Sequence, residues 1–214
     1  MMVMIHLIIF DLDGTLVDSS QDITNAINHA VAGTGLPPYA REQIIKLVGE
    51  GLTKLIENIL PPELEHRKAE ILQKFLDYYS DHIADNTRPY PSVCETLKKL
   101  GKYRKAVLSN KHELLSKRLM GKINIIKYFD YIIGSDTLNE RKPSPKAIHY
   151  LLDTFSLLPE NAMIVGDSEL DIRAGKNARI TTVGVTYGYR QSESLKDADY
   201  LINAMSELIP LLGT

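Results

Sequence analysis

Two aspartates stand one residue apart at the end of an apolar run, in the stretch IIFDLDGTLV that covers residues 8–17. Asp11 and Asp13 are therefore expected at the edge of a buried core. An isolated carboxylate there costs roughly several kcal/mol unless it is paired, hydrogen-bonded or bound to a metal. The pattern D-x-D-G-T arises by chance in about one in a thousand chains of this length, so the pair indicates a site with a compensating partner.

Polar residues also follow two later apolar runs. Ser109 and Asn110 come after KAVL, and Asp167 and Asp171 come after MIVG. Lys142 stands in ERKPSPKAI, just before an expected helix with proline in its first turn. Because ligands of a parallel sheet bind at the carboxyl ends of its strands, these residues are expected to gather with the first two aspartates at one edge.

Converging carboxylates repel one another, so a divalent cation is the simplest compensation, and carboxylate oxygens with water suit Mg²⁺. A magnesium ion beside the Ser109 hydroxyl and the Lys142 ammonium forms a phosphate-sized pocket, because these groups neutralise or hydrogen-bond non-bridging oxygens. The pattern thus predicts phosphoryl transfer with Mg²⁺ as cofactor.

The two acids of the first motif can divide the work. Asp11, fixed at the strand end, suits nucleophilic attack and formation of an aspartyl-phosphate. Asp13 can then protonate the leaving oxygen and activate the hydrolytic water. Gly14 permits a tight turn, and Thr15 is predicted to hold the Asp13 side chain.

The elements that must position these residues read as an α/β protein. Short apolar runs alternate with segments of helical periodicity; the runs are MIHLIIF, KAVLSN, YIIG, AMIVGD and ITTVGV. Since these strands are apolar on consecutive residues, they fit a doubly wound parallel sheet covered by helices on both faces.

One region breaks this rhythm. Residues 18–88 show helix-like pieces and no convincing strand, which predicts an all-helical cap domain inserted into a catalytic core of residues 1–17 and 89–214. Its edges, VDSS and DNTRPYPS, are rich in turn residues. An insertion after the first strand lies above the strand ends, where a mobile lid can close over a site. A bend at Gly49, Glu50 and Gly51 either reaches the substrate or is an ordinary turn between helices.

The stretches FDLDGTLVDS, LSNK, RKPSP and VGDSELD resemble the four motifs of the haloacid dehalogenase superfamily, over nearly the whole chain. The helical insertion is similar to the cap of its phosphoglycolate phosphatase-like branch, and VGEGLTKLI resembles the cap loop of that branch. The resemblance implies the same roles for Asp11 and Asp13, places Ser109 and Lys142 on the phosphoryl group, and makes Asp167 a metal ligand.

The resemblance also implies that the backbone carbonyl of Asp13 binds Mg²⁺ and that Asp171 orients a metal-bound water. The residues expected at the metal are Asp11, Asp13, Asp167 and Asp171, and those expected at the substrate are Thr15, Asn110, Gly49, Glu50 and Gly51. The dehalogenases that name the superfamily lack the second aspartate of the first motif, so Asp13 favours phosphate chemistry.

Composition excludes little else. With 25 basic and 27 acidic residues, net charge -2, nothing marks a nucleic-acid or membrane footprint. The single cysteine, Cys94, cannot form an internal disulfide. The apolar start of the chain lacks a basic lead and a small-residue cleavage site, and no other apolar run approaches about 20 residues. We therefore expect a cytoplasmic monomer or homodimer.

The leading hypothesis is a Mg²⁺-dependent phosphatase for a small phosphorylated metabolite, with phosphoglycolate favoured by resemblance alone. Pyrophosphatase, sugar-phosphate mutase and phosphonoacetaldehyde hydrolase are alternatives within the superfamily, the last requiring a cap lysine such as Lys54 for a Schiff base. A phosphoacceptor signalling domain also uses clustered acids, Mg²⁺, Ser/Thr and Lys-Pro. It is disfavoured because Asp13 is placed to hydrolyse the intermediate and a lid covers it.

Overall fold

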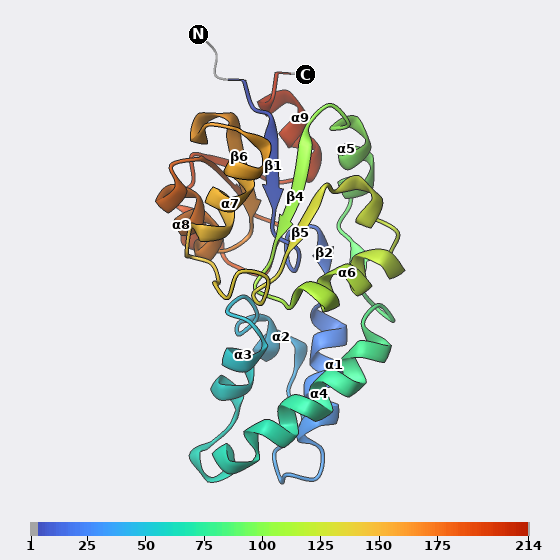
Figure 1. Cartoon of the computed structure of the whole chain (residues 1–214). Helices are drawn as coiled ribbons and strands as arrows, with labels where there is room; N and C mark the ends of the chain where they lie inside the picture. The colour runs from blue at the N-terminus through green and yellow to red at the C-terminus, as the bar shows by residue number, and fades with distance from the viewer. Residues whose placement is uncertain (1–3, 214) are drawn as a thin grey trace.

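A parallel sheet flanked by helices forms one part of the molecule, and a bundle of helices lies beneath the ends of its strands (Figure 1). The computed structural model describes residues 4–213, so the expectations for residues 1–3 and 214 lie outside the described residues. The described ends of the chain lie at the edge of the sheet away from the bundle (Figure 1). No helix among the described residues is long and apolar enough to cross a membrane.

The sheet contains six strands in the order β5-β4-β1-β6-β7-β8, all parallel. The strands are β1 Leu7–Phe10, β4 Arg104–Leu108, β5 Tyr131–Ile133, β6 Ala162–Gly166, β7 Thr181–Val185 and β8 Tyr200–Ile202. The first five match the predicted apolar runs, with β4 beginning one residue before its run. Strand β8 was not predicted, because this short edge strand exposes Tyr200 and Leu201 and has no buried apolar run.

Helices cover both faces of the sheet, as the consecutive apolar residues of its strands require. In β1, Ile8 and Phe10 pack on one face and Leu7 and Ile9 on the other. The first face is covered by α5 Val93–Lys99, α6 Glu113–Lys122 and α9 Leu208–Leu211, and the second by α7 Lys146–Phe155 and α8 Glu169–Ala178. Each such buried side chain contributes about 1.5–3 kcal/mol. The doubly wound fold class is confirmed.

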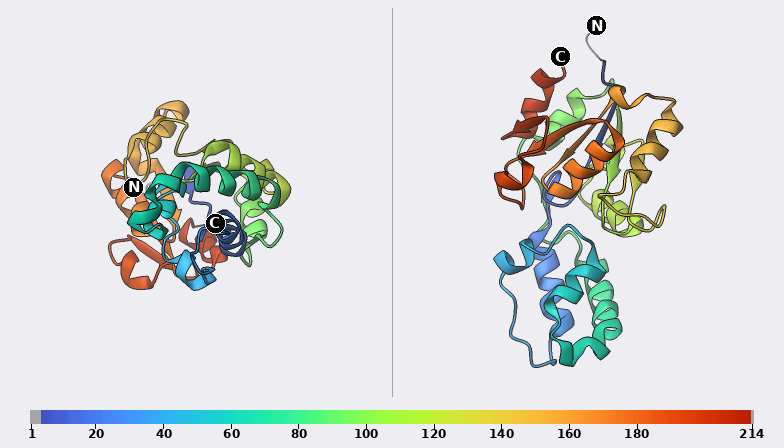
Figure 2. Two further views of the ribbon diagram at one scale, coloured as in Figure 1. Left: turned by 90° about the horizontal axis from the view of Figure 1, so that it is seen from below. Right: turned by 90° about the vertical axis from the view of Figure 1, so that its left-hand side faces the viewer.

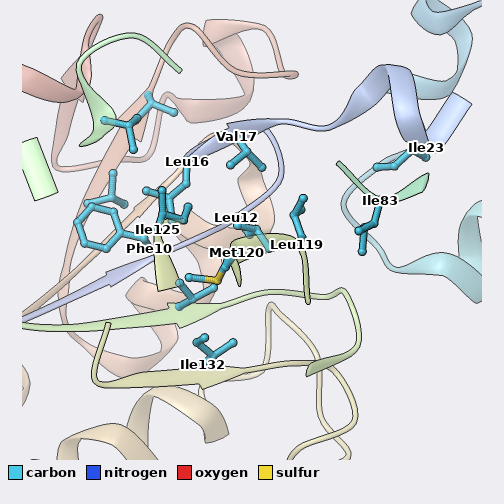
Figure 3. Close-up of a cluster of buried hydrophobic side chains, with 14 of the residues drawn as sticks. Phe10, Leu12, Leu16, Val17, Ile23, Ile83, Leu119, Met120, Ile125 and Ile132 are labelled. Carbon is cyan, nitrogen blue, oxygen red and sulfur yellow. The ribbon is translucent and has the colours of Figure 1, made fainter. Parts of the chain in front are cut away.

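The insertion is all-helical, as predicted. Its helices are α1 Ser20–Val31, α2 Arg41–Ile45, α3 Leu52–Ile59 and α4 Lys68–His82, with the 3-10 turn η1 Pro62–Arg67 between the last two. The other 3-10 turns lie in the core, at η2 Ile126–Tyr128, η3 Pro159–Asn161, η4 Ser192–Leu195 and η5 Met205–Glu207. Two views show these α-helices on the side of the core where the strands end (Figure 2). Apolar side chains continue from Phe10 and Leu12 in the core to Ile23 and Ile83 in the insertion (Figure 3).

The two linkers pair with each other. Strand β2 Val17–Asp18 lies antiparallel to β3 Arg88–Pro89 in a two-stranded ribbon. The sequence does not indicate this ribbon, because each strand is only two residues long and β3 ends in proline. Beside it, the buried Asp22 carboxylate accepts hydrogen bonds from the Asn86 and Thr87 backbone N–H groups and from both side chains. The segments at which the chain enters and leaves the insertion are thus joined by backbone pairing and by the hydrogen bonds of Asp22.

We expect Asp22→Asn to lower the free energy of unfolding by about 2–3 kcal/mol, because one oxygen facing several N–H donors becomes an NH₂ group. Urea unfolding measures the change. Asp153→Asn, on the exposed face of α7, is the matched control and should change stability by less than about 0.5 kcal/mol. Equal stability of the two variants would show that the Asp22 carboxylate does not fasten the linkers.

Candidate active site

Three of the predicted site residues follow directly from the ends of neighbouring strands. Asp11 follows β1, Ser109 follows β4 and Asp167 follows β6, and all three side chains are buried. Asp171 lies in the first turn of α8, where its Oδ2 accepts hydrogen bonds from the N–H and the hydroxyl of Ser168. The parallel order of the strands therefore brings these groups to one edge of the sheet.

Three carboxylates and one ammonium form the centre of the site. Oxygens of Asp11, Asp167 and Asp171 lie within 4.8 Å of one another. The buried Lys142 Nζ lies 2.7 Å from Asp11 Oδ1 and 2.6 Å from Asp171 Oδ1. One ammonium faces three buried carboxylates, so the donor set fits an additional hard divalent cation.

The protonation of this cluster reflects that charge imbalance. Burial raises the pKa of Asp11 well above its usual range, and the neighbouring carboxylates add to the rise against the lowering by Lys142. Burial, with the Asp171 carboxylate, raises the pKa of Asp167 to about 7. Burial alone would lower the pKa of Lys142, but Asp11 and Asp171 overcome it and raise that pKa.

Asp13 has different partners. Its Oδ1 lies 2.7 Å from Lys111 Nζ and accepts a hydrogen bond from the Ser19 hydroxyl. Lys111 Nζ also donates to the Tyr79 hydroxyl at 2.9 Å. Sequence reasoning missed Lys111 and Tyr79 as site residues. The only signal for Lys111 was its position directly after Ser109 and Asn110 in LSNK, whereas Tyr79 lies on α4, far away in sequence.

Thr15 does not hold Asp13. Its hydroxyl donates to Asp167 Oδ1 at 3.2 Å, and the Tyr189 N–H donates to Asp167 Oδ2 at 2.7 Å. The tight turn after Asp13 points Thr15 toward the neighbouring strand end, where it is fully buried and does not line the cavity described below. The prediction that Thr15 holds Asp13 is therefore wrong, whereas its contact with a substrate stays a prediction.

A cavity of about 70 Å³ lies between the core and the helical insertion, with Asp11 and Asp13 in its wall. Its lining comprises Asp11, Asp13, Ile23, Val48, Gly49, Gly51, Leu52, Leu55, Phe75, Tyr79, Ser109, Asn110, Lys111, His112 and Leu115. A volume of this size holds only a few water molecules, so the site as it stands in the structure accommodates a compact ligand.

The bend at residues 49–51 reaches the core beside the cavity, and its contact with the substrate stays a prediction. Gly49 and Gly51 line the cavity with positive φ angles, whereas Glu50 is exposed and does not line it. The Asn110 amide donates to the Gly49 carbonyl at 2.9 Å and to the Lys142 carbonyl at 3.2 Å, so it joins loop and core. Arg190 donates to the carbonyls of Ile45, Lys46 and Val48, which precede this bend. These bonds join the insertion to the core beside the cavity.

The cap lysine considered for a Schiff base does not enter the site. Lys54 is half-exposed, lies 3.7 Å from Glu57 and is not among the residues that line the cavity. Nothing in the described part of the chain therefore favours phosphonoacetaldehyde hydrolase chemistry at this position.

Gly14 controls the position of Asp167. It has φ +88°, and a Cβ there would lie 2.4 Å from Asp167 Oδ2. We expect Gly14→Ala to weaken Mg²⁺ affinity by at least about 10-fold, because it displaces the carboxylate that is predicted to bind the metal. Gly35 has the same φ with no atom within 4 Å of its added Cβ, so Gly35→Ala is the matched control for backbone strain. The Mg²⁺ dependence of activity measures both, and equal affinities would contradict the prediction.

Known proteins share both the sequence and the fold. A family model for haloacid dehalogenase-like hydrolases matches residues 8–185. The chain is 36% identical over 209 residues to phosphoglycolate phosphatase of Aquifex aeolicus, covering 97% of this chain and 96% of the relative. It is 34% identical to phosphoglycolate phosphatase of Vibrio parahaemolyticus, covering 98% and 96% of the two chains.

A solved structure agrees with these relatives. The crystal structure described as that of a predicted phosphoglycolate phosphatase from Haemophilus somnus superposes with a TM-score of 0.91 at 30% identity, over 97% of both chains. The relatives and the fold extend over nearly the whole chain, and the family model covers residues 8–185. The chain belongs to the haloacid dehalogenase-like hydrolase family.

Proposed function

We propose that this protein is a Mg²⁺-dependent phosphatase that hydrolyses a small phosphomonoester, with phosphoglycolate as the favoured substrate. The observation that carries the proposal is the small covered cavity with Asp11, Asp13 and Ser109 in its wall and Lys142 behind Asp11. The names of the relatives, which cover nearly the full chain, support phosphoglycolate.

The proposed reaction has two steps. An Asp11 oxygen attacks phosphorus and forms an aspartyl-phosphate while the bond from phosphorus to the leaving oxygen breaks. Asp13 protonates that oxygen and then takes a proton from water, which attacks phosphorus, so that inorganic phosphate leaves and Asp11 is restored. Ser109 hydrogen-bonds and Lys142 neutralises the phosphoryl oxygens as charge develops.

The metal site is proposed on the donor set. Asp11, Asp167 and Asp171 would hold Mg²⁺. Burial raises the pKa values of Asp11 and Asp167, and the neighbouring carboxylates raise them further while Lys142 lowers them, which supports a need for additional positive charge. The backbone carbonyl of Asp13 remains a predicted ligand. When bound, the cation supplies positive charge beside the non-bridging oxygens of the phosphoryl group.

We further propose that residues 18–88 act as a cap domain on a core of residues 1–17 and 89–214. Opening at the β2–β3 ribbon would admit substrate, and closure would exclude water from the aspartyl-phosphate. The protein is expected to act in the cytoplasm on a small phosphorylated metabolite, without nucleic acid or membrane, as a monomer or homodimer.

Removing the metal is expected to reduce phosphate release by at least about 100-fold, since Lys142 alone would then offset three carboxylates beside the phosphate. Phosphate release is measured with EDTA and again after excess Mg²⁺ is restored, which should recover the rate. Undiminished turnover in EDTA would contradict metal dependence.

A substrate panel tests the function itself. Phosphoglycolate, pyrophosphate, sugar phosphates and phosphonoacetaldehyde are compared for phosphate release with Mg²⁺. Release concentrated on phosphoglycolate supports the proposal, whereas release concentrated on pyrophosphate would replace it with a pyrophosphatase. A phosphorylated protein that persists for minutes without turnover would favour a phosphoacceptor.

A further inference from the structure

Lys111 is the only lysine or arginine among the described residues that line the active-site cavity. Its Nζ lies over the Tyr79 ring, 5.2 Å from the ring centroid. Much of the remaining wall is apolar, and the residues concerned are Ile23, Val48, Leu52, Leu55, Phe75 and Leu115. A ligand that brings a second negative charge into this cavity has one lysine or arginine to meet, and it is Lys111.

The ammonium group retains capacity for a ligand. The Lys111 side chain is 9% exposed, and its Nζ donates to Asp13 Oδ1 at 2.7 Å and to the Tyr79 hydroxyl at 2.9 Å. An ammonium has three N–H donors. Two are thus used by the protein, and the third is available to an acceptor in the cavity.

Its position relative to the reaction follows from Asp13, and this step rests on the proposed function. If Asp13 protonates the leaving oxygen, then Lys111, in direct contact with Asp13, lies beside the leaving group. In phosphoglycolate, a single methylene separates that oxygen from the carboxylate. The carboxylate of phosphoglycolate would therefore lie within reach of the Lys111 ammonium, which is hydrogen-bonded to the proposed general acid Asp13.

We propose that Lys111 binds a carboxylate on the leaving group and thereby selects phosphate esters of short hydroxy acids. The apolar wall disfavours polyhydroxylated leaving groups, because their hydroxyls would be buried there without partners. Lys111 is then a specificity-determining residue for this site.

The test compares two substrates that differ in the charged group. Ethyl phosphate is phosphoglycolate with a methyl group in place of the carboxylate. We expect Lys111→Met to reduce kcat/KM for phosphoglycolate at least about 10-fold more than for ethyl phosphate, mainly through KM. Equal losses on the two substrates would overturn the proposal, since they would show that Lys111 acts only by positioning Asp13.

Three controls sharpen this comparison. Lys54→Met removes a cap lysine outside the cavity and should leave the substrate preference unchanged. Lys111→Arg should retain much of the preference. His112→Gln tests the other basic side chain in the wall, and loss of preference there but not in Lys111→Met would overturn the assignment.

A binding measurement avoids dependence on turnover. In the Asp11→Asn background with Mg²⁺, titration calorimetry should show phosphoglycolate binding weakened at least about 10-fold by Lys111→Met. Unchanged binding would overturn the proposal. Absence of phosphate release from both substrates by the unsubstituted protein would instead reject the proposed function, so the two failures are distinguishable.

Discussion

Replacement of Asp11 by asparagine is expected to reduce phosphate release by about 10⁴-fold or more. The amide keeps the size of the side chain but is a poor nucleophile, so the aspartyl-phosphate cannot form at a useful rate. Asp11 lies in the cavity wall, fixed after β1 and in contact with Lys142 at 2.7 Å. Initial rates on phosphoglycolate with saturating Mg²⁺ measure the effect.

Asp13→Asn is the informative comparison. It removes the proposed acid/base group but leaves the nucleophile, so we expect a smaller loss of about 10²–10⁴-fold and an acyl-phosphate that can be trapped on Asp11 with acid. No such adduct should form in Asp11→Asn. Turnover like that of the unsubstituted protein in Asp11→Asn would refute the mechanism.

The site residues at the strand ends could be predicted from the sequence because each is a polar residue that follows an apolar run, and the strands of a parallel sheet end at the same edge. Asp11, Ser109 and Asp167 each end an apolar run, and a parallel sheet places such ends at one edge. Asp171 follows from its place in the first turn of the next helix. The insertion was equally visible, since a long region lacks any strand pattern.

The remaining contacts depend on how distant segments pack. Tyr79, on α4 of the insertion, contacts Lys111 of the core through the packing of two segments that are far apart in the sequence. Thr15 bonds to Asp167 rather than to Asp13 because the turn orients its hydroxyl toward the neighbouring strand end, and nothing in the sequence separates the two choices. Substitution of side chains whose partners come from another segment therefore tests the structure more strictly than substitution of the motif residues.

Replacement of Lys142 by methionine is expected to cost both activity and stability. Turnover should fall about 10²–10³-fold, because the phosphoryl oxygens lose a preorganised charge. In EDTA at about pH 8, the free energy of unfolding should fall by about 3–5 kcal/mol, since removing one partner leaves buried carboxylates uncompensated. Chemical denaturation with and without Mg²⁺ measures the fall in the free energy of unfolding. Bound Mg²⁺ should make that fall smaller.

The loss of unfolding free energy in Lys142→Met should be larger at high pH than at low pH. The pKa of Asp167 is about 7 in the folded protein against an ordinary 3.8, so the folded state holds this proton more tightly than the unfolded state. Its contribution to stability is full below about pH 4 and is lost as pH rises through about 7. Lys142 lowers the pKa of Asp11 and Asp167, so its removal raises both further. The loss is therefore expected to be smaller at about pH 5 than at about pH 8.

Substitution of a buried lysine outside the site distinguishes the loss of the Lys142 charge from a general loss of packing. Lys105 is also buried, but its Nζ donates to the carbonyls of Leu100 and Tyr103 and contacts no carboxylate cluster. Lys105→Met should destabilise the protein by a similar amount at both pH values. If Lys142→Met shows that same flat profile, the ammonium does not compensate the cluster. If instead only Lys142→Met recovers stability on acidification, Lys142 is the counter-charge that permits three carboxylates to remain buried beside the nucleophile.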